Sequence, residues 1–144
     1  MKNSAILLVL LLLSITSFAF AQTENHKWKT LMTGKRNVWY DLSQLDTIKS
    51  QQFDIWTIEL HKPPITIDGV EEKVTRSKTL YSIDRSVEKY GLKKVVYYNN
   101  VNAEIARYAY DSDESMSATK YYFPTLNNTI IEAIFSELNK KTGK

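Results

Sequence analysis

Apolar side chains recur at every second residue through the middle of this chain, and at helical spacing only near its C-terminus. In the segment 53–60 one face carries Trp56, Ile58 and Leu60, as expected of a strand with one buried side. The apolar residues near the C-terminus instead repeat every four residues: Leu126, Ile130, Ile134 and Leu138. Strands first and one helix last predict an α+β domain, in which a C-terminal α-helix packs on one face of an antiparallel sheet.

The expected strands are six segments: 28–32, 37–41, 53–60, 74–87, 90–98 and 101–110. Pro63-Pro64 is expected to end the third strand, because proline has no N–H to donate to a ladder. Asn99-Asn100 tolerates positive φ angles and predicts a tight hairpin between the last two strands. Residues 120–123 suggest one more short strand, and Pro124-Thr125 is expected to open the helix. No internal repeat is present, so the segments predict a single domain with a sheet of about six strands.

The N-terminus has the three parts of an export signal. Lys2 is followed by the apolar run 5–13, and Ala19-Phe20-Ala21 places small residues before a cleavage site. The apolar run is short for a membrane-spanning helix. We therefore expect residues 1–21 to be cleaved and residues 22–144 to be exported to the periplasm, the cell surface or the medium, without membrane insertion after cleavage.

Charge and cysteine content exclude several classes of protein. The formal net charge is only +3, and nucleic-acid binding would need concentrated basic charge, so no nucleic-acid partner is expected. The chain has no cysteine, which excludes disulfides, thiolate metal sites, a cysteine nucleophile and a lipoprotein anchor.

Four segments follow one another in the order of a known set of motifs: Val38–Leu45, Phe53–Thr57, Tyr81–Arg85 and Phe123–Thr125. In these segments the chain resembles the surface-adhesin protein E family of small exported bacterial proteins. The segments look like the family's aromatic-Tyr-Asp-x-Ser opening, its strand with a central tryptophan, its Ile-Asp-Cys motif and its Pro-Gly-Ser approach to the last helix. Arg85 stands where the family has cysteine, so this chain resembles a divergent member.

The resemblance implies a six-stranded antiparallel sheet backed by a C-terminal helix, and attachment to proteins of a host or the surroundings. No binding residue is carried over from the family, because the matching motifs look like scaffold rather than contact surface.

Catalytic and metal-binding motifs give little support for an enzyme. His26 and His61 lack a flanking nucleophile motif such as Gly-x-Ser-x-Gly. Three carboxylates lie on expected strands at separations that the sequence does not define: Asp41, Asp84 and Glu104. The acidic loop 111–115 lacks the glycine and the final glutamate of an EF-hand. We expect no catalytic, cofactor or metal site.

Nine tyrosines and three tryptophans are the unusual part of the composition. Adjacent tyrosines such as Tyr97-Tyr98 must point to opposite faces of a sheet, which exposes one of each pair unless both pack across strands. We hypothesise that one hairpin carries a partner-binding patch with a basic rim, made of Tyr90, Lys93, Lys94, Tyr98, Arg107 and Tyr108.

The sequence thus predicts an exported, non-catalytic binding protein whose sheet surface contacts an extracellular or cell-envelope protein. The alternative is a periplasmic small-molecule-binding or enzyme-inhibitor module, which an apolar cavity between sheet and helix would favour. A hydrolase that depends on Asp84 or His61 is the third reading. An unpaired edge strand also leaves a homodimer open.

Overall fold

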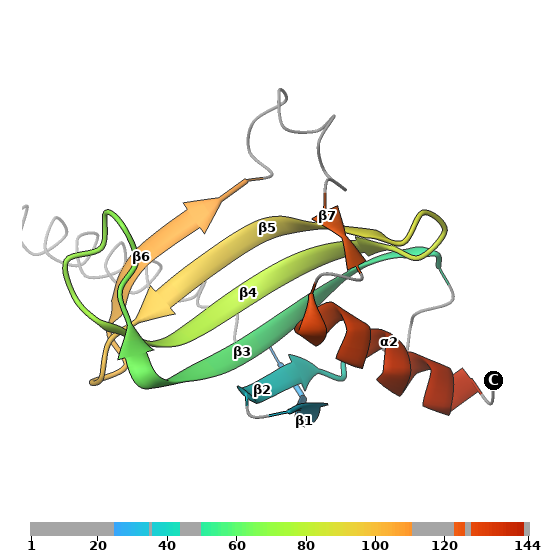
Figure 1. Ribbon diagram of the computed structural model, residues 1–144, viewed down its shortest axis with the longest axis horizontal. Helices are drawn as coiled ribbons and strands as arrows, with labels where there is room; N and C mark the ends of the chain where they lie inside the picture. The colour runs from blue at the N-terminus through green and yellow to red at the C-terminus, as the bar shows by residue number, and fades with distance from the viewer. Residues whose placement is uncertain (1–24, 35, 44–49, 111–122, 126–127, 143–144) are drawn as a thin grey trace, which may run out of the picture.

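One antiparallel sheet with one helix across it forms the architecture (Figure 1). The computed structural model describes residues 25–34, 36–43, 50–110, 123–125 and 128–142. The strands are β1 (Trp28–Thr33), β2 (Arg36–Asp41), β3 (Gln52–Ile65), β4 (Val74–Asp84), β5 (Lys89–Tyr98), β6 (Glu104–Ala109) and β7 (Phe123–Pro124), and the helix is α2 (Thr129–Thr142). The predicted antiparallel sheet with a C-terminal helix is confirmed.

The sheet is a meander, in which β1 to β6 lie in the order of the sequence and β7 pairs with β5. The alternation within strands agrees with the register: Trp56 pairs with Leu80, whereas Ile55 pairs with Tyr81 on the opposite face. Within the described residues, no helix is long and apolar enough to span a membrane.

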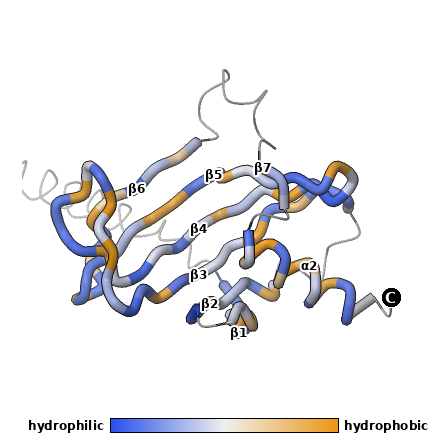
Figure 2. Tube along the Cα trace, in the orientation of Figure 1, coloured by the Kyte–Doolittle hydropathy of each residue, from blue (hydrophilic) through white to orange (hydrophobic). Residues whose placement is uncertain are grey.

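The core lies between α2 and the face of the sheet that it covers, which we call the helix face. Its buried members are Leu31, Val38, Tyr40, Ile55, Tyr81, Ile83, Ile130, Ile131, Ile134 and Leu138. Figure 2 shows hydrophobic residues alternating with hydrophilic ones along α2. The predicted stripe of Ile130, Ile134 and Leu138 is thus confirmed as core, while its fourth member, Leu126, lies outside the described residues.

The expected start of the helix is wrong. Phe123 and Pro124 pair with β5, and α2 begins at Thr129. Asn128 caps the helix, because its Oδ1 accepts hydrogen bonds from the backbone N–H groups of Ile130 (3.0 Å) and Ile131 (3.3 Å). Residues 120–122 of the suggested last strand lie outside the described residues.

The expected end of β3 at Pro63-Pro64 is also wrong, since the strand runs on to Ile65. The pairing of β2 with β3 stops at Asn37 and Leu60, so among the described strands only β4 flanks β3 beyond that point. The pairing of β3 with β4 is irregular between Leu60 and Ile65. Both prolines lie in this irregular stretch, where their missing N–H groups break no regular ladder.

Two further strand ends differ from expectation. β4 ends at Asp84, and residues 85–88 form the turn to β5. β6 begins only at Glu104, because Asn99 organises a longer hairpin turn: its Oδ1 accepts hydrogen bonds from the N–H groups of Val101 (3.1 Å) and Ala103 (2.9 Å).

Candidate binding surface

All three tryptophans of the chain lie on the sheet face opposite α2. Trp28 pairs with Asp41 and Trp39 with Ile58, and both positions alternate with residues of the helix face. We call this surface the tryptophan face. It consists of Trp28, Trp39, Trp56, Ile58, Leu60, Arg76, Lys78, Leu80, Val96 and Tyr98.

Much of the tryptophan face is half-buried, although α2 lies on the other side of the sheet. Trp56 and Val96 are 8% and 3% exposed, whereas Trp39, Leu60 and Tyr98 keep intermediate exposure. Aromatic and aliphatic side chains therefore form a nearly continuous surface around two cations of β4.

Lys78, the first of these cations, lies among aromatic rings. Its Nζ is 4.5 Å from the ring centroid of Trp56 and 5.9 Å from that of Trp28. It also lies 3.0 Å from Nε2 of His26, whose Nδ1 is 2.6 Å from Oδ2 of Asp41. These distances fit an imidazole that donates from Nδ1 to the carboxylate and accepts at Nε2 from the ammonium group.

Asp41 anchors this cluster from a buried position. Its Oδ1 accepts hydrogen bonds from the N–H of Lys27 (3.0 Å) and from the N–H (2.9 Å) and hydroxyl (2.7 Å) of Ser43. Burial alone would raise the pKa of Asp41, but the hydrogen bonds from His26, Ser43 and Lys27 outweigh it and lower that pKa below its ordinary value.

Arg76, the second cation, stacks on an aromatic ring. Its Cζ lies 4.0 Å from the ring centroid of Tyr98, and its register neighbour on β3 is Leu60. Its Nε is buried and has no hydrogen-bond partner in the described part of the chain. Arg36 and Arg107, by contrast, each bind both oxygens of a glutamate.

The predicted partner-binding patch is divided between the two faces. Lys94, Tyr98 and Arg107 follow the register of the tryptophan face. Lys93 joins them because a bulge in β5 at this point breaks the alternation, and its Nζ donates to Oδ2 of Asp54 at 2.8 Å.

Tyr90 and Tyr108 lie on the helix face. Tyr90 packs against the core, with its ring centroid 5.8 Å from that of Tyr81. Tyr108 is 37% exposed and forms an edge contact with Tyr97 at 6.0 Å. The six residues thus do not form one continuous patch, and whether any of them binds a partner stays a prediction.

The tryptophans, Arg76 and Lys78 were not among the predicted site residues. Period-two alternation groups Trp56 with Ile58 and Leu60, but grouping Trp39 and Arg76 with them requires the register between strands, which the sequence does not specify.

A serine–histidine pair lies on the helix face. Nε2 of His61 is 3.0 Å from Oγ of Ser77, and burial lowers the pKa of His61, although Glu59 opposes this effect. The Glu59 carboxylate lies 4.0 Å from Nδ1 of His61 and is held through both oxygens by Arg36 at 2.7 Å. The pair therefore lacks the close orienting hydrogen bond of a catalytic triad.

The carboxylates considered for catalysis are bound separately. Asp84 accepts hydrogen bonds from Ser86 and Gln52, and Glu104 binds Arg107. Asp41 belongs to the cluster on the tryptophan face.

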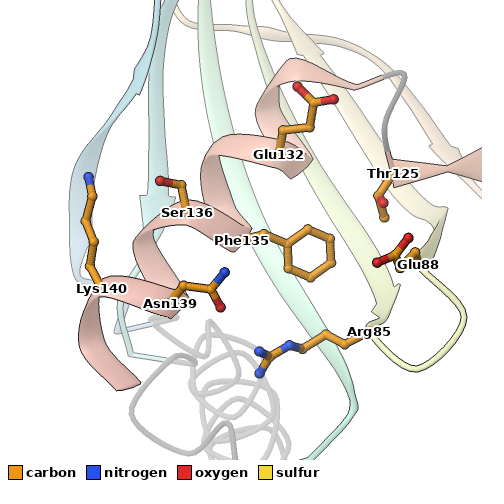
Figure 3. Close-up of a pocket in the computed structure, with 8 residues that line it drawn as sticks. All are labelled: Arg85, Glu88, Thr125, Glu132, Phe135, Ser136, Asn139 and Lys140. Carbon is orange, nitrogen blue, oxygen red and sulfur yellow. The ribbon is translucent and has the colours of Figure 1, made fainter. Parts of the chain in front are cut away.

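A hollow of about 680 Å³ separates α2 from the turn between β4 and β5 (Figure 3). In Figure 3 the Phe135 ring points from the helix toward the side on which Arg85 and Glu88 lie. Arg85, which stands where the resembled family has cysteine, thus lines this hollow. All of the named lining residues except Phe135 carry polar or charged groups, unlike the purely apolar cavity that would favour a small-molecule binder: Arg85, Glu88, Thr125, Glu132, Phe135, Ser136, Asn139 and Lys140.

No protein-family model matches the chain, and no curated protein or solved structure is significantly similar to it.

Proposed function

We propose that this protein is an exported, non-catalytic binding protein, similar to surface-adhesin protein E, that contacts an extracellular or cell-envelope protein through the tryptophan face. One observation carries the proposal: all three tryptophans gather with Arg76 and Tyr98 on the sheet face opposite the helix. Tryptophan, tyrosine and arginine are the residue types that dominate the binding energy of protein interfaces.

Export is part of the proposal and is supported by the signal-like residues 1–21. It is tested by N-terminal sequencing of the protein recovered from the exported fraction of producing cells. A chain that begins at Gln22 is expected, and an intact Met1 in the cytoplasm would contradict export.

The binding surface is tested by comparing variants of the two faces. Trp39→Ala and Tyr98→Ser remove half-buried aromatic side chains of the tryptophan face, and Tyr108→Ser is the matched control on the helix face. The immobilised protein is used to capture proteins from the natural surroundings of the producing cell.

A partner that is retained by Tyr108→Ser and lost by the other two variants supports the tryptophan face, provided that all variants unfold at similar temperatures. A partner that depends on Tyr108 alone would move the binding surface to the helix face and overturn the proposal.

The alternative, a small-molecule-binding or inhibitor module, is favoured by the hollow beside α2. Ser136→Trp is expected to fill this hollow without touching the tryptophan face, because Ser136 is an exposed lining residue. If small charged compounds raise the unfolding temperature of the wild type and this variant loses the effect, the alternative gains support.

A further inference from the structure

We infer that Arg76 is a receptor for a carboxylate, so that the tryptophan face selects an acidic protein segment with apolar flanking residues. This inference deepens the proposed function and depends on it. It names the chemistry of the partner, which the gathering of aromatic side chains alone does not.

The hydrogen-bonding state of Arg76 is the first argument. A guanidinium group satisfies its donors best with a carboxylate held through two parallel hydrogen bonds. Arg36 and Arg107 have such partners in Glu59 and Glu104, whereas the buried Nε of Arg76 has no partner in the described part of the chain. Leaving a buried N–H unsatisfied is unfavourable. Arg76 as a whole is half-buried, and a carboxylate that displaces the side chains covering its Nε would relieve this cost.

Arg76 is also held in place before a partner binds. Its guanidinium stacks at 4.0 Å on the ring of Tyr98, and Leu60 is its neighbour on the other side. Stacking restricts the long side chain before a partner arrives, which lowers the entropy lost on binding. The apolar neighbours exclude water and so strengthen an ion pair formed there.

The third argument is the charge balance of this face. In the described part of the chain, Asp54 is paired with Lys93 and Glu104 with Arg107, while Asp41 is linked to Lys78 through the neutral imidazole of His26. Arg76 lies two residues from Lys78 along the same strand. The positive charge of Arg76 attracts an acidic segment and repels a basic one.

The residues around Arg76 favour a peptide over a bare anion as its partner. The aliphatic residues Ile58, Leu60 and Val96 lie beside the cations on the same face and would be covered by apolar side chains of a partner. An acidic glycan, which stacks sugar rings on tryptophan, is the competing occupant and is included in the test.

The test uses the purified protein and an array of short synthetic peptides in which Asp or Glu is flanked by apolar residues. Each peptide is paired with its Asn or Gln counterpart, and soluble polyuronate and sulfated glycan are measured separately. We expect the acidic peptides to bind about tenfold more tightly than their amide counterparts, the size of a charge-assisted hydrogen-bonded pair.

Arg76→Gln is expected to abolish this preference, while Arg36→Gln, the matched loss of a glutamate-bound arginine on the helix face, retains it. The NMR signal of the Arg76 Nε–H in the wild-type protein gives a second readout that does not depend on a variant. It should shift when acidic peptide is added and stay unchanged with amide peptide.

An unchanged preference in Arg76→Gln, or a wild-type signal that ignores acidic peptide, would overturn the carboxylate receptor. Binding to the glycans alone would overturn the peptide as occupant. If partner capture is lost in Trp39→Ala but intact in Arg76→Gln, the proposed function stands and only this inference fails. Capture that is insensitive to both variants removes both.

Discussion

Asp41 is a carboxylate at 1% exposure that must be fully hydrogen-bonded to remain charged. Its partners come from the residues before β1 and from the end of β2, so this one side chain holds two chain segments together. It also orients His26 beside Lys78, and therefore shapes the tryptophan face.

The first prediction concerns Asp41→Asn. The pKa of Asp41 is lower in the folded protein than its ordinary value of 3.8. The charged form therefore stabilises the fold above about that pH, and the stabilisation is lost as pH falls through the folded pKa. We expect the variant to lose about 1–3 kcal/mol at neutral pH and the two curves of unfolding free energy to converge in acid. Parallel curves in urea titrations at several pH values would contradict this account.

Glu137 is a similarly hydrogen-bonded carboxylate, and it joins α2 to the sheet as Asp41 joins its two chain segments. It accepts hydrogen bonds from Lys140 (2.9 Å), Lys29 (3.0 Å) and Tyr40 (3.4 Å). The hydrogen bonds from the two lysines lower the pKa of Glu137 from 4.5 to about 2, against the effect of burial.

The second prediction follows from this pKa. Because the folded value is depressed, the contribution of Glu137 is present above pH 4.5 and disappears as pH falls to about 2. Glu137→Gln should therefore be less stable than wild type above this window and equal to it below. Glu132→Gln, on the exposed side of the same helix, is the control and should show a smaller difference. Thermal unfolding across the window measures both.

At the scale of the element, α2 depends on more than the apolar repeat of its sequence. Ile131 is fully buried in the core, although it lies beside the four-residue stripe rather than in it. A curved sheet contacts a wider strip of a helix than a single row of side chains, so neighbouring positions are buried together.

The third prediction is that Ile131→Ala destabilises the protein by about 2–5 kcal/mol, as expected for a large cavity-forming substitution in a core. The matched change is Ile58→Ala on the half-buried tryptophan face, which should cost less because part of its surface already contacts solvent. Chemical denaturation of both variants gives the comparison. Equal losses would show that α2 does not cover the main core.

Several elements were predictable because their patterns are local. The alternation in β3 and the stripe of α2 each follow from the sequence within one segment. The continuation of β3 past Pro63, the bulge at Lys93 and the turn held by Asn99 depend on which neighbouring strand is present at each point. The sequence does not contain that information in local form, so these features were missed.

For the whole molecule, the candidate site could not be predicted for the same reason, because it depends on how the strands pair. The sheet-and-helix arrangement follows from the order of segments, but the three tryptophans share a face only because the pairing of β1, β2 and β3 aligns Trp28, Trp39 and Trp56 across the sheet. The sequence predicted exposed aromatic residues with basic neighbours on one hairpin. The register distributes them over two faces.

The fourth prediction uses the position of all three tryptophans on one face of the sheet. Because every tryptophan is on one face, intrinsic tryptophan fluorescence reports on that face alone. A partner bound there should shift the emission and reduce quenching by acrylamide. A partner on the helix face should leave both unchanged, and Tyr108→Ser should not alter the response. An unchanged spectrum with a bound partner would contradict the proposed surface.

The meander has a consequence for how the chain reaches its structure. Each long strand finds its partner next to it in the sequence, so the sheet assembles through small loop closures. The helix instead contacts β1, with Glu137 bound to Lys29 across a separation of 108 residues. We expect the sheet to form first in the newly made chain and α2 to dock last, so that until the C-terminus arrives both faces of the sheet are open to chaperones and proteases.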